Sequence, residues 1–583
     1  MKPEKGKTLI FTLSGYQTKE IKVTGTVHNI ILSLSTTILN DICCDEMVVV
    51  GYGTERKADF TGGIAKMQES ATYTSALQGR VAGVQIRVRG TSSLNAVNRI
   101  PIANVSPYDG MRDEEYGKWK ENRFFDPRQE PLSTFSIDVD AASYSNMRRY
   151  VNRGQLPPAD AVRIEEMINY FSYDYPAPQA GDPVRITTEV GACPWNKTNR
   201  LVRIGLKARD IAGDELPASN LVFLIDVSGS MYGPTRLELV KSSLKLLVNN
   251  LRDKDRVAIV VYAGATGEVL SSTSGANKQL IREKLDALTA GGSTAGGAGI
   301  QLAYSIARKN FIKNGNNRVI LCTDGDFNVG VSSPEGLEKM IEEQRASGVF
   351  LTVLGYGMGN YKDNRLKVLS SKGNGNYAYI DNLQEANKTL VQEFGGTMYA
   401  VAKDVKLQIE FNPAHVKAYR LVGYESRLLN KEDFNNDAID AGEMGAGHTV
   451  TAFYEVVPAG LPWNPTPGVD PLKYQKQEYK PVAEFKNSSP EMLTVKLRYK
   501  APDGDKSTKI ERTLTDNGGD RVNADFRFAA AVAMFGQIMR DSEFKGDATF
   551  DDVAALASKG LDNDAQGYRR EFVRLAESAK GLK

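Results

Sequence analysis

The sequence predicts an α/β protein with a doubly wound, Rossmann-like parallel-sheet domain, a flanking β-sandwich and C-terminal helices. Three observations predict this fold. Short apolar runs alternate with amphipathic stretches from Asn220 to Phe394, and this alternation is typical of a parallel sheet covered on both faces. Segments of strand character lie on both sides of this region. The chain then ends in apolar residues at helical spacing.

Length and composition limit the classes of protein that are possible. At 583 residues the chain exceeds what one hydrophobic core supports, so we expect several domains. A composition of 41% hydrophobic and 25% charged residues excludes a wholly disordered chain. The net charge of +2 gives no field that would select nucleic acid. No apolar stretch approaches the roughly 20 residues of a membrane-spanning helix.

The elements of the central domain follow from their apolar spacing. Leu221 to Ile225 is a continuous apolar run, as expected for a buried parallel strand. From Leu237 to Leu251, apolar residues recur on one face of a helix. The later strands are predicted at 257–261, 318–322, 349–354 and 377–380. The later helices are predicted at 279–288, 298–309, 334–345 and 382–394.

Oxygen-bearing side chains follow the strands of this domain. Asp226, Ser228 and Ser230 come directly after the first strand, Thr294 precedes helix 298–309, and Asp324 follows strand 318–322. Carboxyl ends of parallel strands meet at one edge of a sheet, where ligands bind. Oxygen-only ligands suit a hard divalent cation. A helix-start turn is the alternative for the first motif taken alone, but the three segments together predict a metal site.

This arrangement resembles the von Willebrand factor type A (VWA) domain and its metal-ion-dependent adhesion site. The resemblance covers residues 216–396 and implies that Asp226, Ser228, Ser230, Thr294 and Asp324 hold Mg²⁺, or else Mn²⁺ or Ca²⁺. It also implies an open coordination position for an Asp or Glu of a protein partner. Few of these ligands carry charge, so the ion would keep positive charge that attracts such a carboxylate.

The regions around the central domain resemble the flanks of a VWA protein family of the bacterial envelope. The resemblance rests on residues 131–140, 156–171, 193–195 and 442–454. Predicted strands lie before the central domain (184–190, 200–207) and after it (405–411, 449–457, 492–499). We therefore expect one β-sandwich built from both groups, with the VWA domain inserted. The helical tail, residues 521–539 and 550–582, is expected to pack on that sandwich.

The N-terminal residues carry two further resemblances. Strands at 8–13 and 18–23 resemble the closing hairpin of a carboxypeptidase regulatory-like domain, whose first strands would lie upstream of Met1. Residues 47–54, 76–84 and 89–94 resemble the plug of TonB-dependent transporters, without the barrel that should follow. A flexible Gly/Ser/Thr linker is the alternative, and residues 98–129 suit a polar tether. The predicted domains are 1–35 (hairpin), 36–122 (plug-like fragment and linker), 123–215 (N-terminal flank), 216–396 (VWA) and 397–583 (C-terminal β-rich region ending in helices).

Other patterns have weaker chemical interpretations. Asp138 and Asp140 after an apolar run suggest a phosphatase nucleophile, but Ala142 stands where that family has Thr or Val. Residues 433–437 have the alternating oxygens of a calcium loop but lack its glycine and final glutamate, which favours a polar turn. The chain has no G-x-S-x-G motif, so a serine hydrolase is poorly supported.

The predicted function is therefore non-enzymatic binding of an acidic residue on a protein partner through the metal site. The alternative is a structural or assembly subunit that docks through its VWA domain, as VWA proteins associated with metal chelatases and AAA ATPases do. The resemblances imply the cell envelope, either periplasm or outer-membrane surface, although no signal peptide is visible in the sequence.

Overall fold

The structure is a computed structural model in which the chain divides into two units, Met1–Pro107 and Tyr108–Lys583. It describes residues 8–11, 19–22 and 114–582, except 214, 293–295, 326–333, 360, 395, 397–398, 440, 462–488, 503 and 563.

In the first unit, β1 (Thr8–Phe11) pairs antiparallel with β2 (Lys19–Lys22). This confirms the predicted strand pair, whereas the likeness to a carboxypeptidase regulatory-like domain stays a prediction. The plug-like residues 47–94 lie outside the described residues.

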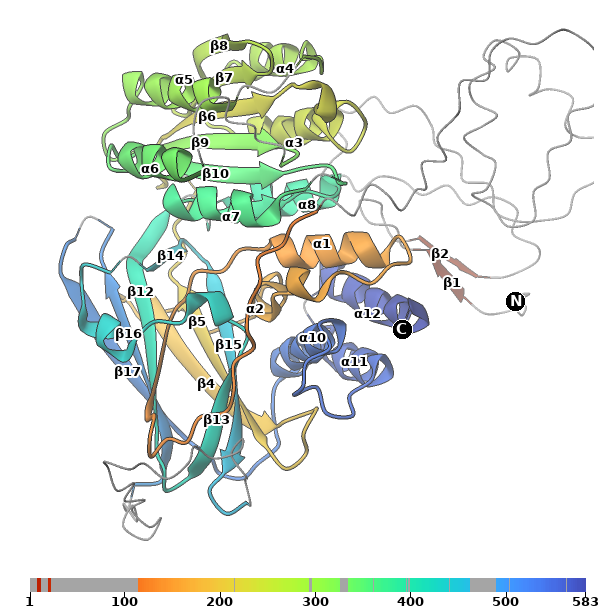
Figure 1. The fold of residues 1–583 in the computed structure, drawn as a ribbon, viewed down its shortest axis with the longest axis vertical. Helices are drawn as coiled ribbons and strands as arrows, with labels where there is room; N and C mark the ends of the chain where they lie inside the picture. The colour runs from red at the N-terminus through yellow and green to blue at the C-terminus, as the bar shows by residue number, and fades with distance from the viewer. Residues whose placement is uncertain are drawn as a thin grey trace, which may run out of the picture. The chain divides into compact units, whose positions relative to one another are not determined.

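The central domain of the second unit contains a six-stranded sheet with the order β11-β10-β9-β6-β7-β8 (Figure 1). Its strands are β6 (Ser219–Asp226), β7 (Arg256–Tyr262), β8 (Thr266–Ser274), β9 (Asn316–Thr323), β10 (Phe350–Gly355) and β11 (Tyr377–Tyr379). All neighbours are parallel except β8, which runs antiparallel to β7. The edge strand β8 was not predicted, and it makes the sheet mixed at this edge. The polar sequence of β8 lacks the apolar run by which the other strands were recognised.

Helices cover both faces of this sheet, which makes it doubly wound. They are α3 (Leu237–Asn249), α4 (Lys278–Asp286), α5 (Gly296–Lys309), α6 (Pro334–Arg345), α7 (Asp363–Lys372) and α8 (Leu383–Asn387), which continues as a π-helical turn (Lys388–Gln392). Alternate residues of β6 enter two cores: Phe223 packs with α3, α4 and α8, and Leu224 packs with α5, α6 and α7. The helix α7 was not predicted, because Leu366 and Leu369 are its only buried apolar residues.

Two further sheets form a sandwich. One has the order β14-β12-β16-β17 with β3 also paired to β12, and the other has the order β13-β15-β5-β4. The strands are β3 (Leu132–Ser136), β4 (Val184–Ala192), β5 (Arg200–Ala208), β12 (Ala400–Phe411), β13 (Val416–Val422), β14 (Gly442–Gly445), β15 (Thr449–Pro458), β16 (Glu491–Lys500) and β17 (Ser507–Thr515). Strands β3 and β5 precede the central domain, yet they pair with β12 and β15, which follow it. The predicted sandwich with an inserted domain is confirmed.

A layer of helices lies beside the sandwich (Figure 1). It comprises α1 (Ala142–Val151), α2 (Ile164–Asn169), α10 (Ala524–Met539), α11 (Phe550–Ala557) and α12 (Tyr568–Ala579). Its apolar core includes Leu201 of β5 and Phe453 of β15, and Phe526 of α10 packs edge-on against Phe453 at 5.5 Å between ring centroids. The tail therefore packs on the sandwich, as predicted.

The segment just before β3 contacts the rest of the second unit. The backbone N–H of Phe125 donates to the carbonyl of Tyr419 in β13 (2.9 Å), and Glu114 forms an ion pair with Arg149 of α1. The expected tether over 98–129 is wrong from Glu114 onward. Polar composition suggested an unpacked segment, but its acidic and aromatic residues bind partners from several elements.

Candidate metal site

The two predicted acidic ligands lie at the same edge of the central sheet. Asp226 is the last residue of β6, and Asp324 follows β9 directly. These strands are parallel neighbours, with Ile225 opposite Cys322. Both carboxylates are buried, Asp226 fully and Asp324 with 2% exposed. The pairing of β6 with β9 thus brings together two residues that are far apart in the sequence.

The loop after β6 folds back onto Asp226. The backbone N–H of Ser228 donates to Oδ1 of Asp226 at 2.9 Å, and the Oγ atoms of Ser228 and Ser230 lie 3.0 Å apart. The hydroxyl of Thr323, at the end of β9, donates to Oδ2 of Asp226 at 3.3 Å. Three of the predicted ligands therefore form one hydrogen-bonded loop.

The third predicted segment approaches the same loop. Thr294 itself lies outside the described residues. The chain just before it is held by two backbone hydrogen bonds: Gly291 N–H donates to Val227 (2.7 Å), and Gly229 N–H donates to Gly292 (2.9 Å). The segment that leads to Thr294 is thus joined to the loop that carries the serines.

The residue after Asp324 is restricted to glycine. Gly325 has φ +94°, a region that favours glycine, and an added Cβ would lie 2.8 Å from the backbone N of Lys362. The turn that ends β9 can therefore pass close to the start of α7 only with glycine at this position.

The carboxyl group of Asp226 titrates well above its usual range. Its pKa is raised to about 6, chiefly by burial and also by the negative charge of Asp324, while hydrogen bonds with Ser228 and Tyr262 oppose the rise. Without a cation, the negative charge of Asp324 disfavours the charged form of Asp226. A divalent cation would remove that penalty, and the carboxylate and hydroxyl donors suit a hard ion. The residues present therefore fit the metal that the sequence implies.

The described residues contain no group of three or more His, Cys, Asp or Glu side chains placed to hold a metal. The predicted donor set needs only two carboxylates, because its other members are hydroxyls. Its chemistry is that of a weakly neutralised cation site, distinct from a carboxylate cage.

A neighbouring arginine was not predicted. Nε of Arg236 lies 4.0 Å from Oδ2 of Asp324, and its Nη2 donates to the carbonyl of Met358 at 2.8 Å. No sequence pattern marked Arg236, since it lies in an irregular loop before α3. Its positive charge beside Asp324 partly takes the place that a cation would have.

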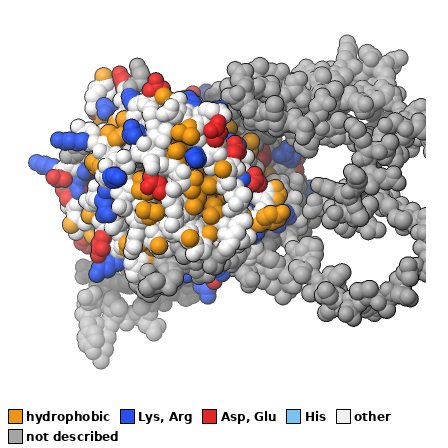
Figure 2. Space-filling model, turned by 90° about the horizontal axis from the view of Figure 1, so that it is seen from above, with side chains coloured by type: hydrophobic (Ala, Val, Ile, Leu, Met, Phe, Trp, Pro, Cys, Tyr) orange, Lys and Arg blue, Asp and Glu red, His pale blue; other side chains and the backbone are white. Residues whose placement is uncertain are grey.

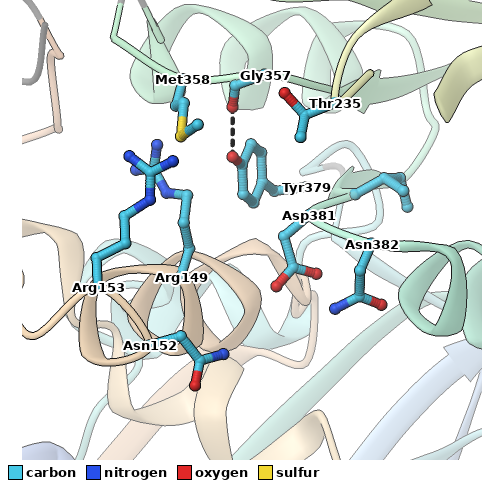
Figure 3. Close-up of a pocket in the computed structure, with 10 residues that line it drawn as sticks. Arg149, Asn152, Arg153, Thr235, Gly357, Met358, Tyr379, Asp381 and Asn382 are labelled. Atoms are coloured by element: carbon cyan, nitrogen blue, oxygen red, sulfur yellow. Dashed lines mark hydrogen bonds between the residues drawn. The ribbon is translucent and has the colours of Figure 1, made fainter. Parts of the chain in front are cut away.

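A pocket of about 230 Å³ lies next to this arginine (Figure 3). Thr235, Gly357 and Met358 of the central domain line one side, and Arg149 and Arg153 of α1 and its end line the other. Sequence reasoning could not find it, because its walls come from four separate segments: 149–153, Thr235, 357–358 and 379–382.

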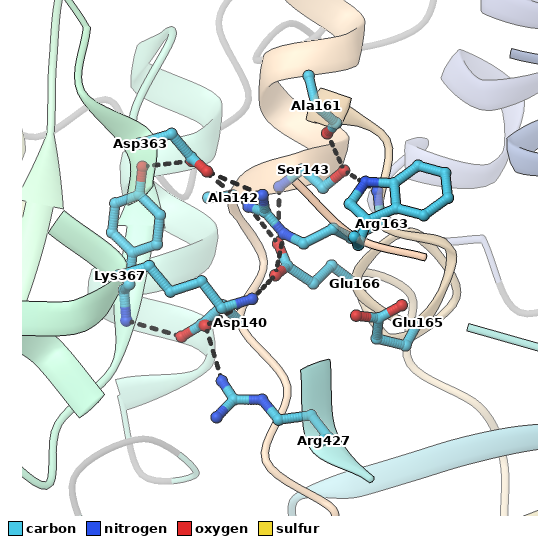
Figure 4. Close-up of polar contacts among 12 residues, drawn as sticks. Asp140, Ala142, Ser143, Ala161, Arg163, Glu165, Glu166, Asp363, Lys367 and Arg427 are labelled. Atoms are coloured by element: carbon cyan, nitrogen blue, oxygen red, sulfur yellow. Dashed lines mark hydrogen bonds and ion pairs between the residues drawn. The ribbon is translucent and has the colours of Figure 1, made fainter. Parts of the chain in front are cut away.

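Ion pairs join the helical layer to the central domain (Figure 4). Arg163, at the start of α2, contacts Asp363 of α7 at 2.8 Å and also pairs with Glu166. Lys367 of α7 contacts the same Glu166 at 2.9 Å. These groups are buried or nearly so, which holds α7 and α2 in one arrangement.

Asp140, the candidate phosphatase nucleophile, belongs to this cluster. Its Oδ2 lies 3.2 Å from Nη2 of Arg427, and its Oδ1 accepts from the backbone N–H of Tyr377. Burial raises its pKa to about 6, with Glu166 and Asp138 adding to the rise and Lys367 and Arg427 opposing it. These contacts give Asp140 a structural role between the flank and the central domain.

The weak calcium-loop pattern is a polar turn. Asp433 accepts from the backbone N–H of Asn430 in a capping box at the start of a 3-10 helix (Lys431–Asn435). Asp437 accepts from the hydroxyl of Ser507 (2.6 Å) and from Arg498. Both carboxylates are thus engaged by donors of the chain itself.

The fold and the site define a VWA-domain protein. Residues 220–393 match the family model described as the von Willebrand factor type A domain, and residues 110–203 match a model described as von Willebrand factor. VWA domains mediate protein–protein interaction. Residues 396–582 match the model described as the C-terminal region of the uncharacterized protein YfbK.

Among relatives, the chain is 44% identical over 477 residues to the uncharacterized protein YfbK of Escherichia coli, covering 80% of this chain and 81% of that protein. The chain therefore belongs to the YfbK family of VWA proteins. It is also 36% identical over 111 residues to the TonB-dependent receptor P26 of Formosa agariphila, covering 15% of this chain and 11% of the receptor. The likeness to TonB-dependent receptors is thus partial.

Among solved structures, the chain is similar to the von Willebrand factor type A structure from Catenulispora acidiphila. The identity is 15%, the match covers 78% of this chain and 91% of that one, and the TM-score is 0.35.

Proposed function

We propose that this protein is a non-enzymatic binding protein that captures an acidic residue of a protein partner through a divalent cation. The cation, Mg²⁺ or else Mn²⁺ or Ca²⁺, is held by Asp226, Ser228, Ser230, Thr294 and Asp324. Bound there, it supplies positive charge and an open coordination position to an incoming carboxylate. The observation that carries the proposal is the meeting of Asp226 and Asp324, both buried, at the carboxyl ends of adjacent parallel strands.

The surroundings of the site also suit a protein partner. Tyr232 directly follows the serine-containing loop and is 82% exposed. Exposed aromatic residues are enriched at protein interfaces, because they bury a large area at low entropic cost. The surface seen in Figure 2 has basic and acidic side chains interspersed, which suits a local contact better than binding of a polyanion such as nucleic acid.

The cell envelope is the location we infer. The inference rests on the family membership and on the partial likeness to TonB-dependent receptors. Of the helices in the described residues, none has the length and apolarity needed to cross a membrane.

The test is calorimetric titration of Mg²⁺ and Mn²⁺ into chelator-stripped protein. We expect saturable binding near one ion per chain, which Asp226→Ala abolishes. Asp253→Ala removes an exposed acidic residue of the same domain and is the matched control. Equal binding by the wild-type protein and Asp226→Ala would overturn the metal site.

A partner assay separates adhesion from the assembly alternative. An acidic peptide library screened with and without Mg²⁺ should yield binders that depend on the metal and weaken in Tyr232→Ala. If the protein binds metal but no acidic ligand, the assembly-subunit function is favoured.

A further inference from the structure

A second cavity lies at the opposite end of the central sheet from the metal site. Its volume is about 430 Å³, within the range of small-molecule sites. Arg318, near the start of β9, and Phe350, at the start of β10, line it from the VWA domain. Glu443 of β14, Ser426 and His448 line it from the sandwich side. The cavity thus lies where the inserted domain meets the sandwich.

Arg318 differs from the other buried arginines of the described chain. Those arginines each have a carboxylate oxygen within ion-pair distance: Arg148, Arg149, Arg163, Arg203, Arg420, Arg540 and Arg569. Arg318 is only 3% exposed, and no carboxylate of the described residues lies within 4.0 Å of it. A buried guanidinium without a counter-ion is unfavourable, because burial removes its hydration.

The neutral contacts of Arg318 leave part of its donor set unused. Nη1 donates to the hydroxyl of Thr352 at 2.8 Å, Nε approaches Oδ1 of Asn316 at 3.4 Å, and the guanidinium lies 5.6 Å from the ring centroid of Phe350. None of the described residues accepts a hydrogen bond from Nη2. The guanidinium is therefore held in place by neutral groups while one edge remains available.

The titration of Arg318 agrees with this lack of a counter-ion. Burial lowers its pKa to about 10, although the negative charge of Glu443 opposes the change. In contrast, nearby carboxylates raise the pKa of the buried Arg148 and Arg163.

Besides Arg318, Arg345 and Glu443, the other charged residues of the lining form ion pairs with one another. Arg427 pairs with Asp138 and Asp140, and Lys372 pairs with Glu342. The lining also includes His448, whose buried Nδ1 has no hydrogen-bond partner in the described part of the chain. Two polar side chains with unused hydrogen-bonding capacity thus face one cavity.

We propose that this cavity binds the carboxylate or phosphate group of a small molecule through Arg318. A guanidinium matches the planar arrangement of two anionic oxygens, and the bound anion would supply the missing counter-charge. Because Arg318 lies between the VWA domain and the sandwich, occupancy would stabilise their junction. The site is separate from the metal site and does not depend on it.

The test measures anion binding to the full chain after divalent cations have been stripped and the chelator removed by dialysis, so that neither the metal site nor a carboxylate-bearing chelator contributes. Inorganic phosphate, acetate and succinate are titrated at constant ionic strength, with thermal unfolding and calorimetry as readouts. We expect saturable binding of these anions and a larger rise in Tm than the same ionic strength of chloride produces. Arg318→Gln should weaken binding at least about tenfold, the loss expected for a charge-assisted hydrogen bond.

Two variants keep the test decisive. Arg153→Gln removes an exposed arginine just after α1 that does not line this cavity, and this variant should bind anions like the wild-type protein. Ser426→Trp places a bulky side chain at an exposed position of the lining and should weaken anion binding while Arg318 stays intact. This variant provides the test if Arg318→Gln does not fold. The proposal would be overturned if these anions raised the Tm of the wild-type protein no more than chloride does. It would also be overturned if Arg153→Gln and Arg318→Gln lost anion affinity equally.

Discussion

Nη2 of Arg148 donates to Oε2 of Glu385 at 2.7 Å, which ties α1 of the helical layer to α8, the last helix of the VWA domain. Arg148 is fully buried and also pairs with Asp381 and Glu571. Its carboxylate partners raise its pKa, so it stays charged. One arginine thus compensates three acidic groups from the central domain and the C-terminal helices.

Replacing Arg148 by methionine should destabilise the protein by about 3–5 kcal/mol, because Asp381 and Glu385 would stay buried without a counter-ion. The free energy of unfolding in urea measures this loss. Arg153→Met, at an exposed position just after the same helix, should change it by less than about 0.5 kcal/mol. If Arg148→Met lowered the free energy of unfolding no more than Arg153→Met does, the ion pairs of Arg148 would not contribute to stability.

Arg236→Gln should tighten Mg²⁺ binding by about threefold or more, because it removes a positive charge 4.0 Å from a predicted ligand oxygen of Asp324. Calorimetric titration at low ionic strength measures the change. Added salt should reduce the difference in Mg²⁺ affinity between the wild-type protein and Arg236→Gln, since Arg236 is partly exposed and its charge is screened. Weaker binding in Arg236→Gln would show instead that the arginine positions Asp324.

Asp140 should make stability depend on pH. Its folded-state pKa of about 6 exceeds the usual value of 3.8, so its contribution is complete below pH 3.8 and is lost as the pH rises through 6. Between pH 5 and pH 7 the free energy of unfolding of the wild-type protein should fall by about 1 kcal/mol relative to that of Asp140→Asn. Urea unfolding in EDTA across this range measures the difference. Parallel pH profiles of the two proteins would contradict the prediction.

The docking of the tail helices should depend on their aromatic core. Phe535 of α10 is fully buried and contacts Phe550 and Phe572 edge-on or tilted. Phe535→Ala should cost about 3–5 kcal/mol of unfolding free energy, because it leaves a cavity that neighbouring rings cannot fill. Phe311→Ala, at a position that is 45% exposed, is the control and should cost far less.

Elements with strong local patterns were predictable. The helix 334–345 has the bounds expected from its apolar spacing, and strand β6 differs from the prediction only at its ends. The edge strand β8 and helix α7 were missed, because their sequences are polar and tertiary contacts stabilise them. Asn382 was expected as the first residue of a helix and is its N-cap, where its side chain accepts from the backbone N–H of Glu385.

The sequence by itself determined the α/β core, five strands of the sandwich (β4, β5, β12, β15 and β16) and the oxygen donors at the ends of β6 and β9. These features can be predicted because they depend on residues close together in the sequence. The spacing of apolar residues identifies the helices and strands, and the positions just after the strands identify the oxygen donors. Only the tertiary structure decided that Arg236 lies beside Asp324, that Arg148 joins α1 to α8, and that Arg318 is buried without a carboxylate partner. These relationships join residues distant in sequence, and burial gives each charge its energetic consequence.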